Sequence, residues 1–377
     1  MNVLAVAKLQ KYFGAVQEGT VAIHFSFGPM REPAVKHPTI SDVAALAGVS
    51  KSTVSAVLNN KKIRETTRRA VLRVIEELNY RPSPSARRGF RPATGKSITF
   101  IVKEAPNPYY AEILLGIQQV AGDQGYLISV SSSEGSYEVE RRIVEQCTER
   151  EVDGLIITPI LSDDVDLSHL FELKRHGAPF VLLEEVRGIR AHLVDVDNVK
   201  ASGEAVKFLI DQGHSLIVHF AGPKYSEHTQ ERADGVRRAF SESHLRFDEA
   251  MIVHAGASPE DGYRVGLEYF GARREDHPTA VTCYNDLVAL GLLKALRELG
   301  IRVPEDVSVI GFDGLDLLDY FPLPLTTVRV PKYEMGKRAA EILIRQIESR
   351  TSSPAEPEKV ALKAELVVRA STRRLTA

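Results

Sequence analysis

Apolar segments alternate with helical segments over most of the chain, and this alternation limits the fold more than any other sequence feature. Continuous apolar runs of four to six residues are typical of parallel strands that are covered on both faces. Eight such runs lie between residues 97 and 312: SITFIV, YLISVS, DGLIIT, PFVLLE, LIVHFA, AMIVHA, TAVTCY and VSVIGF. With helices between them, the runs predict an α/β fold of two doubly wound lobes separated by a crevice.

A different pattern precedes this region. Thr39, with Asp42 three residues later, has the spacing of a capping box, and Gly48 can end the helix that Thr39 begins. Ser50 is placed to cap a second helix. Three short helices are expected, at about 40–47, at 51–59 and from about 65 onwards. A tight glycine-containing turn between the first two predicts a helix-turn-helix motif.

The charge of the chain is divided unevenly. The whole chain has a net charge of −2, but residues 36–96 have thirteen basic and four acidic residues, a net charge of +9. Residues 97–377 are correspondingly acidic, which points to a polyanion as partner of the basic segment. Lys51 and Ser52 lie on the first turn of the second helix, the end that enters the major groove in this motif. The alternative is a solvated helix face in a small helical bundle.

The stretch TISDVAALAGVSKSTVSAVLNN, followed by TRRAVLRVIEELNYRPS, resembles the DNA-binding domain of the LacI/GalR family of bacterial transcription regulators. The resemblance implies that Lys51, Ser52 and Ala56 read bases. The family usually has Arg at the third position, and Ala56 can touch a thymine methyl group but cannot hydrogen-bond to guanine. The residues expected to contact DNA are Thr39, Lys51, Ser52, Thr53, Ser55, Ala56 and Asn59, and in the following segment Ala86, Arg87 and Phe90.

The segment RPSPSARRGFRPATGKS matches the position of the family's hinge, here residues 82–96, after a DNA-binding domain at 37–81. In the family a short hinge helix inserts an apolar side chain into the minor groove, and Phe90 is the candidate for that role. The alternative is a flexible linker whose arginines only contact phosphates. The segment also resembles a phosphate-binding loop, but five residues separate Gly89 from Gly95 where that motif needs four.

The resemblance implies that residues 97–377 form the effector-binding and dimerisation domain, with the two-lobed fold of periplasmic binding proteins. The expected boundaries put about 97–194 and 326–355 in the first lobe, including a late helix at about 332–348. The second lobe is expected at about 195–325 and 356–377. Residues 1–36 match no part of the family, and they could be a disordered arm or precede a start at Met30.

Polar and aromatic residues near strand ends are the candidates for effector binding. They are Tyr109, Tyr110, Glu184, His228, Arg232, Asn285 and Asp313. Arg232 and Asp313 match the family's ligand-binding positions; His228 is expected at the rim, and Asp286 is expected to cap the next helix in preference to Asn285. Paired acceptors, a forked donor and flat apolar rings suit a sugar or sugar derivative. Core packing of Tyr109 and a structural Arg232–Asp313 ion pair are the alternatives.

Other functions find little support in the sequence. Two distant cysteines, Cys147 and Cys283, exclude a disulfide framework, and neither cysteines nor histidines show a metal-binding spacing. No catalytic motif, cofactor motif, secretory signal or membrane-spanning run is present. We therefore expect a cytoplasmic homodimer or tetramer that binds operator DNA and is no enzyme. The rival hypotheses are a transport-type sugar-binding protein and an enzyme on a doubly wound fold.

Replacing Phe90 by alanine tests the hinge hypothesis. Phe90→Ala should weaken operator binding and reduce DNA bending, because an inserted apolar side chain unstacks and kinks the duplex. Effector affinity should stay nearly unchanged. Bending can be measured by energy transfer between the ends of a labelled operator, and an unaltered bend would favour the linker.

Overall fold

The computed structural model describes residues 39–58, 63–78, 96–149, 152–161, 166–224, 226–272, 277–349 and 356–375. The chain divides into two compact units, residues 1–93 and 94–377. The expected DNA contacts Asn59, Ala86, Arg87 and Phe90 lie outside the described residues, as do residues 1–36 and nearly all of the hinge.

Three helices make up the described part of the first unit: α2 Ile40–Leu46, α3 Lys51–Leu58 and α4 Glu65–Glu77. Val43 from α2, Val54 from α3 and Val71 from α4 are fully buried against one another. Each of these helices is too short to be stable alone, so the shared apolar cluster holds the unit together. The predicted helix-turn-helix is confirmed.

The turn between α2 and α3 is closed by the residues that predicted it. The backbone N–H of Thr39 donates to the Asp42 carboxylate at 2.7 Å. Gly48 has φ +66°, and the next residue, Val49, donates its N–H to the carbonyl of Ala44 at 3.0 Å. This is a Schellman ending, which favours glycine because the left-handed conformation crowds a Cβ atom. Ser50 Oγ then accepts the N–H of Thr53 at 3.1 Å, as an N-cap does.

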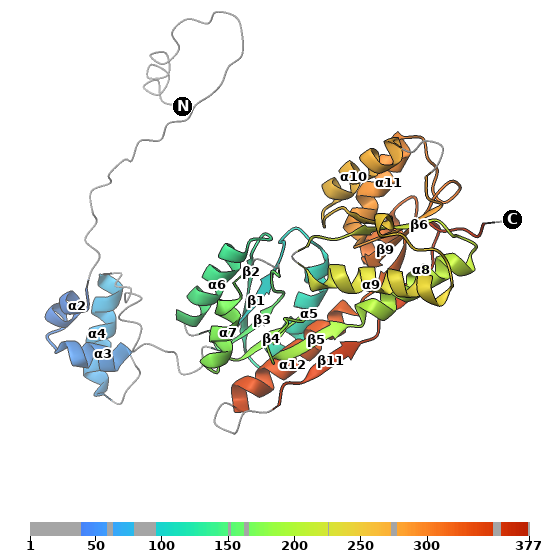
Figure 1. The fold of residues 1–377 in the computed structure, drawn as a ribbon. Coiled ribbons are helices and arrows are strands. Elements are labelled where there is room, and N and C mark those ends of the chain that lie inside the picture. Colours follow the sequence, from blue (N-terminus) through green and yellow to red (C-terminus); the bar gives the residue numbers. More distant parts are fainter. Residues whose placement is uncertain are drawn as a thin grey trace, which may run out of the picture. The chain divides into compact units, whose positions relative to one another are not determined.

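The second unit contains two six-stranded sheets, one in each lobe (Figure 1). The first has the order β11-β5-β4-β3-β1-β2 and is parallel throughout. Its strands are β1 Ser97–Val102, β2 Leu127–Ser132, β3 Gly154–Ile157, β4 Phe180–Leu182, β5 His192–Val196 and β11 Lys359–Leu362. The second has the order β12-β10-β9-β8-β6-β7, and its edge pair β10–β12 is antiparallel. Its strands are β6 Ile217–Ala221, β7 Ile252–His254, β8 Ala280–Cys283, β9 Ser308–Asp313, β10 Thr326–Arg329 and β12 Glu365–Val367.

Helices cover both faces of each sheet, as the apolar runs predicted. In the first lobe α5 and α12 pack on the face of Ile98 and Phe100, and α6 and α7 pack on the face of Ile101. These helices are α5 Tyr109–Asp123, α6 Tyr137–Glu149, α7 Ser168–Arg175 and α12 Lys332–Glu348. In the second lobe α8 and α9 cover one face, and α10 and α11 cover the other. They are α8 Asn198–Asp211, α9 Glu227–Glu242, α10 Pro259–Gly271 and α11 Asp286–Glu298, with short 3₁₀ turns at Glu249–Met251 and Asp316–Tyr320.

The chain passes between the lobes three times, and two of the expected boundaries were wrong. The passages follow β5, β10 and β11. Strand β10 pairs with β9 and belongs to the second lobe, whereas β11 pairs with β5 and belongs to the first. Both strands have only four residues with mixed polarity, so hydrophobic patterning did not reveal them. The late helix α12 does belong to the first lobe, where it packs on α5.

Glycines allow α5 and α12 to approach closely. A Cβ atom at Gly116 would lie 2.0 Å from the carbonyl oxygen of Tyr333, and one at Gly336 would lie 2.0 Å from that of Ile113. Backbone therefore packs on backbone here, without intervening side chains. Among the described helices, none is long and apolar enough to span a membrane.

Enlarging Gly116 tests this packing. Gly116→Ala should destabilise the unit by about 1–3 kcal/mol, because the added methyl group forces α5 and α12 apart. Gly122→Ala is the matched control: it lies on the same helix, but its Cβ atom would meet nothing within 4 Å, so it should be neutral or slightly stabilising. Chemical denaturation followed by circular dichroism suits a chain without tryptophan. Equal effects of the two variants would contradict the packing argument.

Candidate functional site

The first turn of α3 presents polar side chains to solvent. Lys51 and Ser52 are exposed, and Thr53, Ser55 and Ala56 are partly exposed. Their opposite neighbours Val54 and Val57 are buried in the core of the unit. Thr39 is exposed but has its hydroxyl group 2.7 Å from Asp42, so it also serves as a helix cap. The structure thus gathers the described members of the predicted DNA-contacting set on α3 and at the start of α2.

In the second unit one cavity lies between the two lobes, with about 520 Å³ of space that is partly open to solvent. All seven candidate effector residues line it, and they come from both lobes. The lining residues are Lys103, Glu104, Asn107, Tyr109, Tyr110, Thr158, Leu183 and Glu184 from the first lobe, and Pro223, His228, Arg232, Ala257, Tyr284, Asn285 and Asp313 from the second.

Tyr109 and Tyr110 begin helix α5 and pack edge to face, with ring centroids 5.3 Å apart. Tyr110 also packs edge to face on Phe100, and the hydroxyl group of Tyr109 lies 3.6 Å from the sulfur of Met335. Burial raises the pKa of both phenols well above the ordinary value, so both are neutral donors. The two rings therefore form part of the core and of the cavity wall at the same time.

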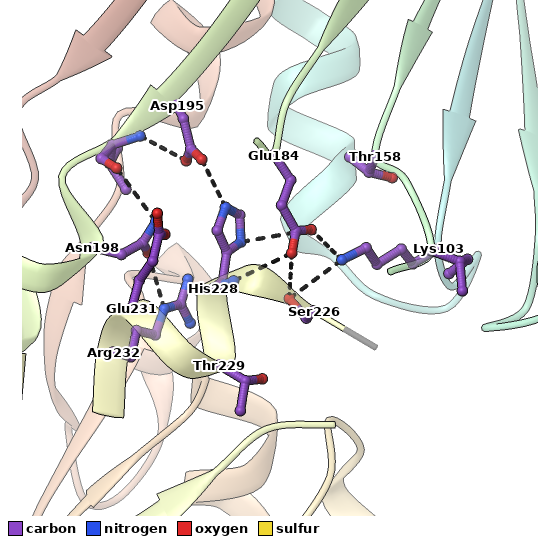
Figure 2. Close-up of polar contacts among 12 residues, drawn as sticks. Lys103, Thr158, Glu184, Asp195, Asn198, Ser226, His228, Thr229, Glu231 and Arg232 are labelled. Carbon is purple, nitrogen blue, oxygen red and sulfur yellow. Dashed lines mark hydrogen bonds and ion pairs between the residues drawn. The ribbon is translucent and has the colours of Figure 1, made fainter. Parts of the chain in front are cut away.

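Glu184, just after β4, joins the two lobes through a buried polar network (Figure 2). It forms an ion pair with Lys103 of its own lobe. From the second lobe, Ser226 Oγ donates to it at 2.7 Å and the backbone N–H of His228 at 3.2 Å. Burial raises the pKa of Glu184, but Lys103, His228 and the hydrogen bond from Ser226 together outweigh burial and lower it to about 2. Glu184 is therefore a carboxylate that already has donors from both lobes.

Arg232 lies on helix α9 with its guanidinium group between two rings. The group is 3.6 Å from the centroid of Phe312 and 4.8 Å from that of Tyr284. Its Nε donates to Asn198 Oδ1 at 3.0 Å, and Nη1 donates to the carbonyl of Tyr284. Nη1 also lies 4.0 Å from Asp313 Oδ1. These contacts fix the plane of the guanidinium group at the cavity wall.

Asp313 ends β9 in a strained backbone conformation, with φ +110°. The ammonium of Lys332 holds the turn by donating to the carbonyls of Asp313 and Gly314, both at 2.8 Å. Such strain persists only where the surroundings enforce it, and it is common at ligand sites. Burial raises the pKa of the Asp313 carboxyl, although Arg232 and Lys332 act in the opposite direction.

The expected cap of α11 was wrong. Asn285, not Asp286, is the N-cap: its Oδ1 accepts the N–H of Val288 at 2.8 Å, and its Nδ2 donates to the carbonyl of Ala257. Asp286 is fully buried and accepts the hydroxyl of Thr327 at 2.6 Å and the N–H of Leu315 at 2.8 Å. These hydrogen bonds let Asp286 support the turn at Asp313. Because Leu315 and Thr327 are distant from Asp286 in the sequence, no local sequence pattern predicts this role.

His228, expected at the rim, lines the cavity and is largely but not fully buried. Its side chain is 12% exposed, and Nε2 lies 2.9 Å from Asp195 Oδ2. Burial would lower the pKa of His228, but Asp195 and Glu184 outweigh it and raise the pKa above the ordinary value. Glu231, one turn further along α9, has its pKa raised to about 7 by burial. The N-terminus of α9 therefore enters the interior at this point.

The sequence analysis missed several polar residues that line the cavity, namely Lys103, Glu104, Asn107, Thr158 and Tyr284, and also Ser226, which hydrogen-bonds to Glu184. Ser226 Oγ lies 3.2 Å from the hydroxyl of Tyr284 and 3.3 Å from Nζ of Lys103. Lys103 and Tyr284 each come directly after a buried strand. That position is the signal that could have revealed them, because the carboxyl ends of parallel strands meet at the ligand crevice.

Comparison with known proteins gives matches in both units. Residues 39–83 match the family described as bacterial regulatory proteins, lacI family, and residues 206–372 match a periplasmic binding protein-like domain. The HTH-type transcriptional repressor PurR of Photobacterium profundum is 34% identical over 342 residues, which cover 89% of this chain and 99% of the relative.

Two solved structures share the fold. The transcriptional regulator CelR in complex with cellobiose is 30% identical, with a TM-score of 0.66 and coverage of 89% of this chain and 99% of that one. A LacI family regulator from Enterococcus faecium with bound ribose is 26% identical, with a TM-score of 0.65 and coverage of 74% and 100%.

The PurR and CelR relatives each cover 89% of the chain and so extend over both units, and both are transcriptional regulators. Both the α3 surface and the two-lobed domain fit that function. The chain is therefore a DNA-binding transcriptional repressor that belongs to the LacI family of bacterial regulatory proteins.

Proposed function

We propose that the repressor binds a sugar or sugar derivative in the cavity between its lobes, and that this effector controls operator affinity. The observation that carries the proposal is the arrangement at one wall of the cavity. The guanidinium of Arg232 lies 4.0 Å from the carboxyl of Asp313, and two tyrosine rings line the same cavity. A polyol needs such forked donors, paired acceptors and flat apolar faces.

The solved relatives with bound cellobiose and ribose support this chemical class. The lining of the cavity combines polar and apolar groups, and a sugar, which has both hydroxyl groups and apolar ring faces, needs both. Ala257 stands where the family often has an aromatic residue, so the ring contacts would come from Tyr109 and Tyr110 instead.

Control of DNA binding requires that the effector prefers one arrangement of the lobes. Tyr109, Tyr110 and Glu184 belong to the first lobe, and Arg232 and Asp313 belong to the second. A ligand that contacts both sets stabilises their closed arrangement. We propose that residues 82–96 carry this change to the helix-turn-helix, and that the repressor acts on cytoplasmic DNA as a homodimer or a tetramer on a pseudo-palindromic operator.

Removing the charge of Asp313 tests the effector site. Asp313→Asn should weaken effector binding by about 10- to 100-fold, because hydrogen bonds to a charged group contribute about 1.5–3 kcal/mol. Asparagine also tolerates the positive φ of this position better than alanine. The change in operator affinity that wild type shows with effector should be lost, whether the effector weakens or strengthens binding.

The measurement is an operator titration with and without each member of a ligand panel of sugars, sugar phosphates and nucleobases. Asp316→Asn is the matched control, because this side chain is 73% exposed and lies three residues away. A normal response in Asp313→Asn would exclude Asp313 from the site. A response of wild type to nucleobases alone would exclude the sugar hypothesis but not the cavity.

Replacing Lys51 by alanine tests the DNA-binding surface. Lys51→Ala should relax base preference at one position of each half-site, at a cost of roughly 1–3 kcal/mol. Arg73→Ala, an exposed change on α4, controls for the loss of one positive charge and should not alter base preference. Selection of bound sites from a random DNA pool measures both. An unchanged preference in Lys51→Ala would contradict base reading by this residue.

A further inference from the structure

Three potential metal ligands meet at the wall of the cavity, where the chain passes from the first lobe to the second. Asp195 lies in β5, and His228 and Glu231 lie one turn apart at the start of α9. One ligand atom from each residue lies within 4.8 Å of the other two. In the described part of the chain, no other group of three histidine, cysteine or acidic residues meets this condition.

The chemistry of the three side chains suits a transition metal. One imidazole and two carboxylates are a common donor set for Zn²⁺ and its neighbours, whereas Mg²⁺ and Ca²⁺ prefer oxygen ligands alone. In a tetrahedral zinc site the ligand atoms are about 3.3 Å apart, given bonds of about 2.0–2.2 Å. His228 Nε2 and Asp195 Oδ2 are now 2.9 Å apart. A metal ion would therefore need these two groups to separate by only a few tenths of an ångström.

Each of the three side chains is also held in place by a second contact (Figure 2). Asp195 Oδ1 accepts the N–H of Val196 at 2.7 Å, and Glu231 Oε2 accepts Nδ2 of Asn198 at 2.9 Å. The remaining ring nitrogen of His228, Nδ1, lies 4.0 Å from Glu184 Oε2. A carboxylate behind a histidine is a frequent arrangement around metals, because it orients the ring and increases its basicity.

We propose that Asp195, His228 and Glu231 bind a divalent transition metal ion such as Zn²⁺. The three ligands leave a fourth position for water or an exchangeable ligand. Since Asp195 belongs to the sheet of the first lobe and the other two belong to the second, the bound ion would tie the lobes together. The metal would then favour the closed arrangement independently of the identity of the effector.

The test is titration of the metal-free full-length protein, without an affinity tag, with Zn²⁺ in a calorimeter. We expect one ion per chain and a rise in thermal stability on binding. Glu231→Gln is the diagnostic variant, because the amide oxygen can still accept from Asn198 but is a poor zinc ligand. It should lower zinc affinity by at least about tenfold and leave the circular dichroism spectrum of the metal-free protein unchanged.

Glu242→Gln is the matched control, since this carboxylate is exposed near the end of the same helix and pairs with Arg238. It should bind Zn²⁺ as wild type does, and Mg²⁺ should not bind the trio in any of the proteins. Absence of zinc binding to wild type would overturn the proposal. Unchanged affinity in Glu231→Gln would overturn it as well, because the ion would then be bound elsewhere.

Discussion

Parallel strand order is the constraint from which the site follows. In a parallel sheet all carboxyl ends lie at the same edge, and the residue after each strand faces the same crevice. Lys103 follows β1, Glu184 closely follows β4, Tyr284 follows β8 and Asp313 ends β9. Because the two sheets meet at these edges, side chains up to 210 residues apart in sequence line one cavity. The fold thus concentrates polar groups where the two lobes approach each other.

Burying charged groups in a protein interior costs free energy unless each charge is paired with an opposite charge or hydrogen-bonded. Lys103 compensates Glu184, and Lys332 is bonded to carbonyls at the turn of Asp313 and lies 3.2 Å from Glu112. Removing one partner of such a buried pair generally costs roughly 3–5 kcal/mol, since an uncompensated charge remains. Both lysines lie where first-lobe elements meet the second lobe, so the charge balance depends on how the lobes are arranged. A bound ligand with its own polar groups can change how these buried charges are paired.

The sequence analysis predicted correctly the features that depend on residues close together in the chain, such as helix caps. Thr39, Gly48 and Ser50 predicted both helix ends of the turn, because capping involves residues within three or four positions. The eight apolar runs also became strands, and the central ones are buried on both faces, which requires apolar residues along the whole strand; the edge strands β2 and β7 are more exposed. Strands β10 and β11 were assigned to the wrong lobes, because pairing partners cannot be read from four residues of mixed polarity.

The sequence by itself determined the helix-turn-helix, the α/β class and, through resemblance, which residues to place near the ligand. Tertiary structure decided how each of them is used. It made Asn285 a cap and Asp286 a support, and it placed His228 beside Asp195 from the other lobe. It also placed Lys103 and Ser226 against Glu184. Apart from the cap, these roles rest on contacts between residues 29 to 81 positions apart, and spacing along the chain contains no information about such contacts until the sheets are ordered.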